Sequence, residues 1–176
     1  MKKINIKELA TFAMVAAIYV VLTWALSFMS YGGIQFRIAE ALVLLCFFNK
    51  KYFIPLTVGC IIANALSPLG IIDVIFGTCA TILALVGVMF SKNLIVASIF
   101  PVIFNGIIVS LEICYLEGSF TWPTFWLNCG TVALGEFVCV TIIGVVLFTL
   151  LRKNKGFMSL ICANQNIKDL DIKENE

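Results

Sequence analysis

Residues 31–51 read YGGIQFRIAEALVLLCFFNKK, and this stretch decides how the chain is placed relative to a membrane. A Gly-Gly turn is followed by Arg37 and Glu40 among apolar residues, and the apolar run then ends at Lys50 and Lys51. The run covers about 11 residues, whereas a spanning helix needs about 20. It is therefore either one arm of a re-entrant hairpin or a spanning helix that less apolar residues complete at its ends.

The whole chain has the composition of a membrane protein. Of its 176 residues, 61% are hydrophobic and 12% are charged, whereas a typical soluble domain has about 25% charged residues. Six apolar runs follow one another at 9–28, 38–48, 53–66, 71–90, 94–116 and 125–151. Four of these six runs reach the length of a spanning helix. We therefore expect an all-α integral membrane protein.

The basic residues indicate which ends of the runs lie together. If all six runs span, every one of the 12 basic residues except Arg37 falls on the same side. A re-entrant hairpin would move Lys50 and Lys51 to the other side, so six spans agree better with the positive-inside rule. We predict six transmembrane helices in residues 1–155, with both termini cytoplasmic, and a polar cytoplasmic tail over residues 156–176.

Several kinds of chemistry lack their usual residues. The sequence contains no His, and its seven Cys lie singly, without a Cys-x-x-Cys pair. Catalysis through His and the common metal sites are therefore not expected. The glycine-rich loop ending in Lys-Ser/Thr, which binds the phosphates of ATP, is also missing. We predict that the protein is not an enzyme and has no catalytic residue, no metal site and no nucleic-acid partner.

Two glutamates inside the last two apolar runs are the strongest candidates for a binding site. Ionisable side chains inside a membrane are costly, so they usually face a functional cavity. At about 1.5 Å per residue, Glu112 lies roughly 30 Å and Glu136 roughly 24 Å from the cytoplasmic end of its run. No Lys or Arg occurs between residues 93 and 151 to neutralise them. We predict that both carboxylates reach the outer half of the membrane and share one pocket.

Other polar and aromatic residues could line the same pocket. Asn105 precedes Glu112 by seven residues and shares its helix face, although a hydrogen bond between helices would also explain an amide there. Asn128 precedes Glu136 by eight residues and aligns with it less closely. Trp126 either offers an aromatic face to a flat ligand or belongs to the aromatic belt at the membrane surface.

Two further features have both a structural and a functional interpretation. Asp73 starts the fourth run, where a carboxylate also stabilises the N-terminus of a helix. Ala13 and Ala17 are four residues apart in the first run and form a small-residue face suited to close contact with another helix. That helix could belong to this chain or to a partner subunit.

The chain resembles the QueT family of queuosine-precursor transporters in four stretches: YGGIQFRIAEALVLL, GCIIANALSPLGIIDVIFGT, FNGIIVSLEICYLEG and FWLNCGTVALGE. The resemblance covers about residues 5–155. It implies the fold of a substrate-binding (S) component of an energy-coupling factor (ECF) transporter, an ABC-type importer of the plasma membrane. The implied partners are a transmembrane scaffold (T) subunit and two ATPase subunits. These partners use the ATP, so no cofactor is expected in this chain, and in such S-components a face like that of Ala13 and Ala17 contacts the scaffold.

The resemblance also implies a substrate and roles for the residues around the first loop. The substrate would be a queuosine precursor such as 7-aminomethyl-7-deazaguanine or queuine, captured on the outer side. The loop would close over it, with Tyr31 supplying an aromatic face and Gln35 a polar contact. Arg37 and Glu40 would stand at the mouth of the second helix, where a pair three residues apart can neutralise itself.

Three alternative functions remain to be tested. The same fold could carry another flat vitamin or nucleobase. The chain could also act alone as a proton-coupled transporter through Glu112 and Glu136. An intramembrane enzyme is the third alternative, and the residues present offer no paired nucleophile and base to support it.

Overall fold

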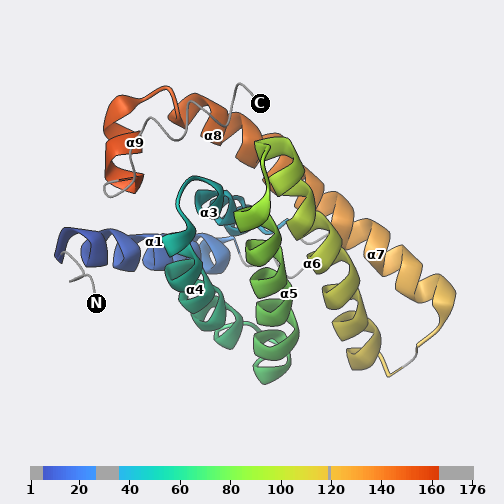
Figure 1. The fold of residues 1–176 in the computed structure, drawn as a ribbon. Helices are drawn as coiled ribbons and strands as arrows, with labels where there is room; N and C mark the ends of the chain where they lie inside the picture. The colour runs from blue at the N-terminus through green and yellow to red at the C-terminus, as the bar shows by residue number, and fades with distance from the viewer. Residues whose placement is uncertain (1–5, 27–35, 119, 163–176) are drawn as a thin grey trace.

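The computed structural model describes residues 6–26, 36–118 and 120–162 (Figure 1). All regular secondary structure in these residues is helical. The elements are, in chain order, α1 (Ile6–Ala25), the 3₁₀ helix η1 (Ile38–Leu44), α3 (Leu45–Phe48), the 3₁₀ helix η2 (Lys50–Tyr52), α4 (Phe53–Ala65), α5 (Ile71–Phe90), α6 (Leu94–Leu116), α7 (Trp122–Glu136), the π-helix η3 (Phe137–Gly144), α8 (Val145–Leu151) and α9 (Lys155–Ile161). The prediction of an all-α protein is confirmed for the described part of the chain.

Polar residues between the apolar runs set where the helices begin. The side chain of Asn93 caps α6 by accepting a hydrogen bond from the backbone N–H of Ile95. The side chain of Thr121 caps α7 by accepting one from the backbone N–H of Thr124. Pro123 lies in the first turn of α7, where a helix needs no N–H donor. With these caps in place, α5 and α6 coincide with the predicted runs 71–90 and 94–116.

Four helices in the described residues are long and apolar enough to cross a membrane. They are α1, α5, α6 and the continuous 30-residue helix Trp122–Leu151, in which α7, η3 and α8 follow one another without a break. The predicted second and third spans form shorter helices, namely Ile38–Phe48 and the 13 residues of α4. Neither has the ~20 residues that cross a bilayer unaided. The described structure thus contains four candidate spans, and the number six stays a prediction.

The short helix Ile38–Phe48 lies in the centre of the molecule (Figure 1). Most of its side chains are buried, and it packs against α1, α5 and η3. Gly144 of η3 permits a close approach, since a Cβ there would lie 3.1 Å from Leu44 and 3.3 Å from Ala41. The seven residues of η1 make an unusually long 3₁₀ helix. The charged stretch that begins at Arg37 therefore opens the central helix of the bundle.

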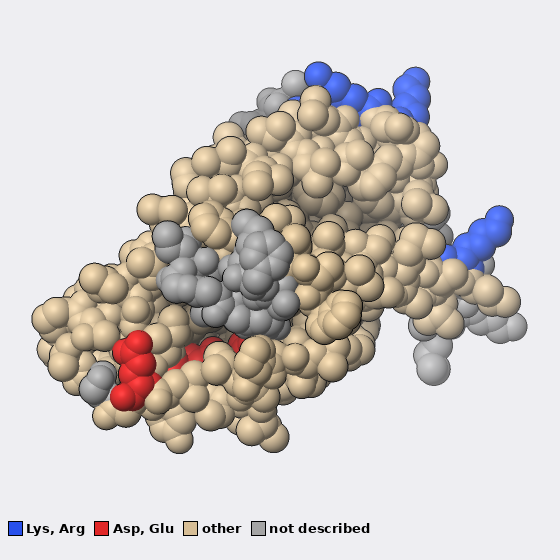
Figure 2. Space-filling model, turned by 180° about the vertical axis from the view of Figure 1, so that it is seen from behind, with Lys and Arg blue, Asp and Glu red and all other residues tan. Residues whose placement is uncertain are grey.

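The outside of the bundle is apolar, and its charges are separated. Large hydrophobic side chains are exposed along α1, α6 and the helix Trp122–Leu151, as expected for contact with lipid. Figure 2 shows Lys and Arg side chains gathered toward one end of the face in view and acidic side chains toward the other. The exposed basic residues of the described chain are Lys7, Lys50, Lys51, Lys92, Arg152, Lys153 and Lys155.

The packed structure continues past residue 155, where we predicted the membrane domain to end. The helix α9 and the residue after it place Met158, Ile161 and Cys162 in the hydrophobic core. The side-chain amide of Asn49 donates a hydrogen bond to the carbonyl of Ile161 (2.8 Å). Residues 155–162 therefore belong to the bundle, and the rest of the predicted tail lies outside the described residues.

Helix α5 packs tightly against α6 at Gly87, where a Cβ would lie 2.3 Å from a ring carbon and 2.9 Å from the Cβ of Phe100. We expect Gly87→Ala to destabilise the protein by about 1–3 kcal/mol, because the two helices must move apart. Gly130→Ala is the matched control, since nothing lies within 4 Å of its Cβ position. Thermal unfolding in detergent should show a lower midpoint for Gly87→Ala alone, and equal midpoints would contradict this packing.

Candidate functional site

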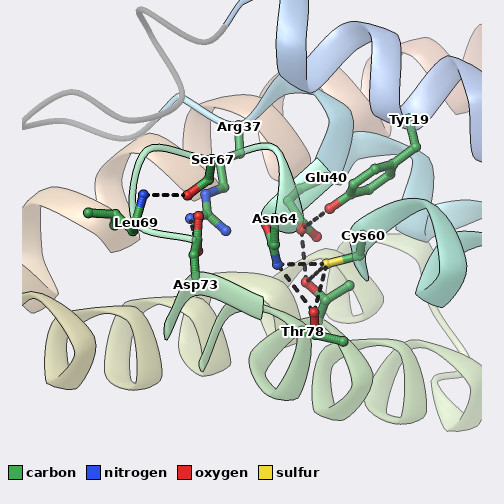
Figure 3. A network of polar contacts seen from close by, with 10 residues as sticks. Tyr19, Arg37, Glu40, Cys60, Asn64, Ser67, Leu69, Asp73 and Thr78 are labelled. Atoms are coloured by element: carbon green, nitrogen blue, oxygen red, sulfur yellow. Dashed lines mark hydrogen bonds and ion pairs between the residues drawn. The ribbon is translucent and has the colours of Figure 1, made fainter. Parts of the chain in front are cut away.

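Polar side chains from α1, α4, α5, α6, α7 and the start of the central helix meet inside the bundle, and Figure 3 shows those from α1, α4, α5 and the central helix. None of them is more than 7% exposed, so they lie in the interior rather than at its edge. We call this group the buried cluster. It consists of Tyr19, Arg37, Glu40, Cys60, Asn64, Asp73, Thr78, Thr81, Asn105, Glu112 and Glu136.

Arg37 forms an ion pair with Asp73 in the first turn of α5, with Nη2 3.2 Å from Oδ1. Gly77 leaves room for this carboxylate and for Asn64, since a Cβ there would lie 2.8 Å from Asp73 Oδ1 and 2.8 Å from Asn64 Nδ2. We predicted that Arg37 and Glu40 neutralise each other near the membrane surface, but the ion pair that Arg37 forms within the described residues is with Asp73. Arg37 is buried, and its backbone (φ −86°, ψ 78°) is not helical. Arg37 and Glu40 still interact electrostatically, without direct ion-pair contact.

Glu40 is instead held by hydroxyl groups from two neighbouring helices. Its Oε1 accepts a hydrogen bond from the Tyr19 hydroxyl of α1 (2.5 Å) and another from the Thr81 hydroxyl of α5 (2.9 Å). The thiol of Cys60 in α4 donates to Thr81 Oγ1 (3.3 Å). The second oxygen of Glu40, Oε2, is buried and has no hydrogen-bond partner. One side of this carboxylate is therefore fixed, and the other is available.

Sequence reasoning missed five members of the buried cluster: Tyr19, Cys60, Asn64, Thr78 and Thr81. Asn64 had a usable signal, because it is an amide inside an apolar run like Asn105, and it donates to Thr78 Oγ1 (3.3 Å). The two threonines and the cysteine are small residues that helix packing explains equally well. A single Tyr in a long apolar run carries no specific signal.

Glu112, Glu136 and Asn105 are fully buried, and none of their side-chain oxygen and nitrogen atoms has a hydrogen-bond partner. The side-chain amide of Asn105 lies near the carboxylates of both Glu40 and Glu136, but it forms no hydrogen bond with either. A buried polar group without a partner costs about 1–3 kcal/mol. These side chains are therefore poorly explained as contributors to stability.

Among the described residues, Arg37 is the cation that interacts with all of the surrounding buried acids. It interacts electrostatically with Glu112, whose other acidic neighbour is Asp73, and with Glu136, whose other acidic neighbour is Glu40. The two predicted glutamates thus both interact with one guanidinium. Neither forms an ion pair with it, so both carboxylates remain available.

The remaining predicted pocket residues that the structure describes, Trp126 and Asn128, lie outside the buried cluster. Trp126 is 63% exposed, which fits a residue of the aromatic belt. Asn128 is half-buried, and its amide donates to Cys114 Sγ (3.8 Å). Tyr31 and Gln35 lie outside the described residues.

The two alanines predicted for docking lie on the outer surface of α1. Ala13 and Ala17 are exposed, whereas the buried residues of this helix are Tyr19 and Thr23. The small-residue face is therefore not packed against the described helices of this chain. It is free to contact lipid or another subunit.

The buried cluster sets four carboxyl groups, those of Glu40, Asp73, Glu112 and Glu136, against the single guanidinium of Arg37. Carboxylate oxygens accept hydrogen bonds, and a charged partner makes those bonds stronger. A ligand with several N–H donors and a positive charge would satisfy the atoms that the protein leaves without partners. The arrangement suits recognition of a polar small molecule.

An all-helical bundle with an apolar exterior and such an interior is a membrane protein of the transporter class, and comparison with known proteins agrees. Residues 9–153 match the family model described as QueT transporter. The chain is 42% identical over 156 residues to the queuosine precursor transporter QueT of Lactococcus lactis subsp. cremoris (strain MG1363). The alignment covers 81% of this chain and 90% of the relative. The chain therefore belongs to the QueT transporter family. No solved structure matches it.

Double-mutant cycles should separate the two possible partners of Arg37. We expect Arg37→Gln to destabilise the protein by about 3–5 kcal/mol, because it leaves a buried carboxylate without its cation. Adding Asp73→Asn should recover part of this loss, whereas adding Glu40→Gln should recover less, because only Asp73 contacts the guanidinium. Unfolding in detergent measures both coupling energies, and a larger coupling with Glu40 would contradict the ion pair.

Proposed function

We propose that this chain is the substrate-binding S-component of an ECF transporter, which captures a queuosine precursor outside the cell and delivers it inward. Membership of the QueT transporter family and the similarity to the queuosine precursor transporter of Lactococcus lactis support this proposal. The observation that carries it is the burial of Glu112 and Glu136 without protein partners. Side chains in this state are expected where a ligand completes the site.

The functional groups of a 7-deazaguanine match those that the buried cluster leaves open. The N1–H and 2-amino groups of its guanine edge are parallel donors, and one carboxylate can accept both. The aminomethyl group is cationic at neutral pH and favours a second carboxylate. The ring carbonyl and ring nitrogen of the ligand accept hydrogen bonds, and the side-chain N–H groups of Asn105 can donate to them. In this arrangement Glu112 and Glu136 bind opposite ends of the ligand, and Arg37 keeps the site from becoming too negative.

The proposed topology has six spans, with both termini in the cytoplasm. The basic residues gathered toward one end of the molecule support it, because this end would face inward (Figure 2). The central helix and α4 would serve as the second and third spans. Asp73 near the start of α5 and Glu112 near the end of α6 would then lie toward the outer side, where the substrate enters.

The proposed partners are a T subunit and two ATPase subunits, which supply the energy. The exposed alanine face of α1, formed by Ala13 and Ala17, is the proposed contact with the T subunit. Small side chains let another helix approach closely, and this is how helices associate in a bilayer that provides no hydrophobic driving force. The plasma membrane is the expected location.

Calorimetry on the purified protein tests the substrate and the site. We expect binding of 7-aminomethyl-7-deazaguanine, and a loss of about tenfold or more in affinity for Glu112→Gln and for Glu136→Gln, since a hydrogen bond to a charged group is worth about 1.5–3 kcal/mol. Glu117→Gln is the matched control, because this glutamate is exposed one helical turn beyond Glu112. Unchanged affinity in both buried variants would rule out the assigned pocket.

A competition series with guanine, queuosine precursors and riboflavin identifies the cargo. Tighter binding of riboflavin or of plain guanine than of any queuosine precursor would favour the alternative cargo, namely another flat vitamin or nucleobase.

Uptake into vesicles tests the partners. We expect uptake only when the T and ATPase subunits are present, and a loss of about tenfold or more for the double variant Ala13→Leu/Ala17→Leu, because leucines hold the partner helix away. Substrate binding should be unchanged in this variant. Gly130→Leu, which enlarges an exposed small residue on another helix, is the control. Uptake by this chain alone, abolished by an uncoupler, would instead support the proton-coupled alternative.

A further inference from the structure

Helix α1 reaches the buried cluster through one side chain. Its buried residues are Tyr19 and Thr23, and the rest of the helix is half-buried or exposed. The hydroxyl of Thr23 donates to the carbonyl of Tyr19 within α1 (2.9 Å), so it makes no link to another helix. The hydroxyl of Tyr19 donates to Glu40 (2.5 Å). Among the described residues, Tyr19 is thus the polar connection between α1 and the cluster.

Glu40 lies between this connection and the groups proposed to bind substrate. Its Oε1 receives the hydroxyls of Tyr19 and Thr81, and its Oε2 is buried without a partner. Asn105 and Glu136, which belong to the proposed pocket, are also neighbours of this carboxylate. A ligand donor that binds Oε2, or that draws Glu136 or Asn105 toward itself, must change the environment of Glu40. Such a change reaches Tyr19 directly.

The backbone of α1 follows the position of Tyr19 because the helix is close to α4 at this point. A Cβ on Gly59 of α4 would lie 3.1 Å from the carbonyl oxygen of Ala16 and 3.1 Å from Cβ of Tyr19. Tyr19 is also only 3% exposed, so close packing surrounds the side chain as well as the backbone that carries it. Ala17 lies only two residues from Tyr19 and is exposed on the outer surface.

We propose that Tyr19 is a positioning residue that orients Glu40 toward the substrate. Through the same hydrogen bond, the stability with which α1 packs on the bundle depends on whether the site is occupied. This inference rests on the proposed function, because it takes the buried cluster as the substrate site and α1 as the docking helix. Coupling between two sites requires an element that both of them bias. Here that element is α1, with the Tyr19–Glu40 bond on its inner side and the alanine face on its outer side.

Hydrogen exchange of α1, measured with and without 7-aminomethyl-7-deazaguanine, tests the proposal on the full chain. In the unchanged protein we expect ligand to alter the exchange rates of the α1 amides by roughly tenfold, as expected when a hydrogen bond to a charged group is strengthened or lost. In Tyr19→Phe the α1 response should fall below about twofold, while the amides around Glu112 in α6 still respond to ligand.

Two matched variants distinguish positioning from a general loss of structure. Thr23→Val removes the other buried hydroxyl of α1 without touching Glu40, so its α1 response should equal that of the unchanged protein. Thr81→Val removes the second donor to Glu40 from α5, so it should weaken ligand binding and keep the α1 response.

The outcomes separate this inference from the proposed function. If the unchanged protein binds the deazaguanine and α1 responds equally in Tyr19→Phe, the positioning role is refuted and the substrate site stands. If ligand leaves α1 unaffected in the unchanged protein, the coupling is likewise refuted. If no deazaguanine binds to the unchanged protein at all, the proposed function fails and this inference fails with it.

Discussion

The bundle depends on holding one permanently charged guanidinium inside an apolar protein. Arg37 cannot lose its proton, so the fold must surround it with acceptors and negative charge. Asp73 supplies the direct contact, and the other buried acids supply the surrounding field. The pair joins the start of the central helix to the start of α5. Because either charge alone would be strongly destabilising, this junction fixes how the two helices are placed.

Some of the acids around this pair have hydrogen-bond or ion-pair partners in the protein and others have none. This difference separates acids that stabilise the fold from acids that are candidates for binding a ligand. Asp73 and one oxygen of Glu40 have protein partners, whereas the carboxylates of Glu112 and Glu136 have none. A bundle selected for stability alone would have apolar residues in these places. The buried cluster is thus a folded frame in which the carboxylates of Glu112 and Glu136 are left without protein partners.

Two irregular helices bring these groups together. The central helix starts as a long 3₁₀ segment, and Glu136 is the last α-helical residue before the π-helical η3. A 3₁₀ helix is narrower and a π-helix wider than an α-helix, so each changes which side chains face inward. The two segments pack against each other at Gly144. Departures from α-helical geometry of this kind are common at functional sites.

Apolar length and charge placement in the sequence predicted the all-α membrane class and the extents of the long helices, and they singled out Glu112, Glu136 and Asn105, which the structure places in the interior. These follow from local physics, because apolar length, capping residues and the cost of a buried charge are properties of short segments. Only the tertiary structure decided that Arg37 pairs with Asp73 and that Tyr19 reaches Glu40. Such contacts join residues 36 and 21 positions apart, so they depend on how helices pack and not on any spacing within one helix.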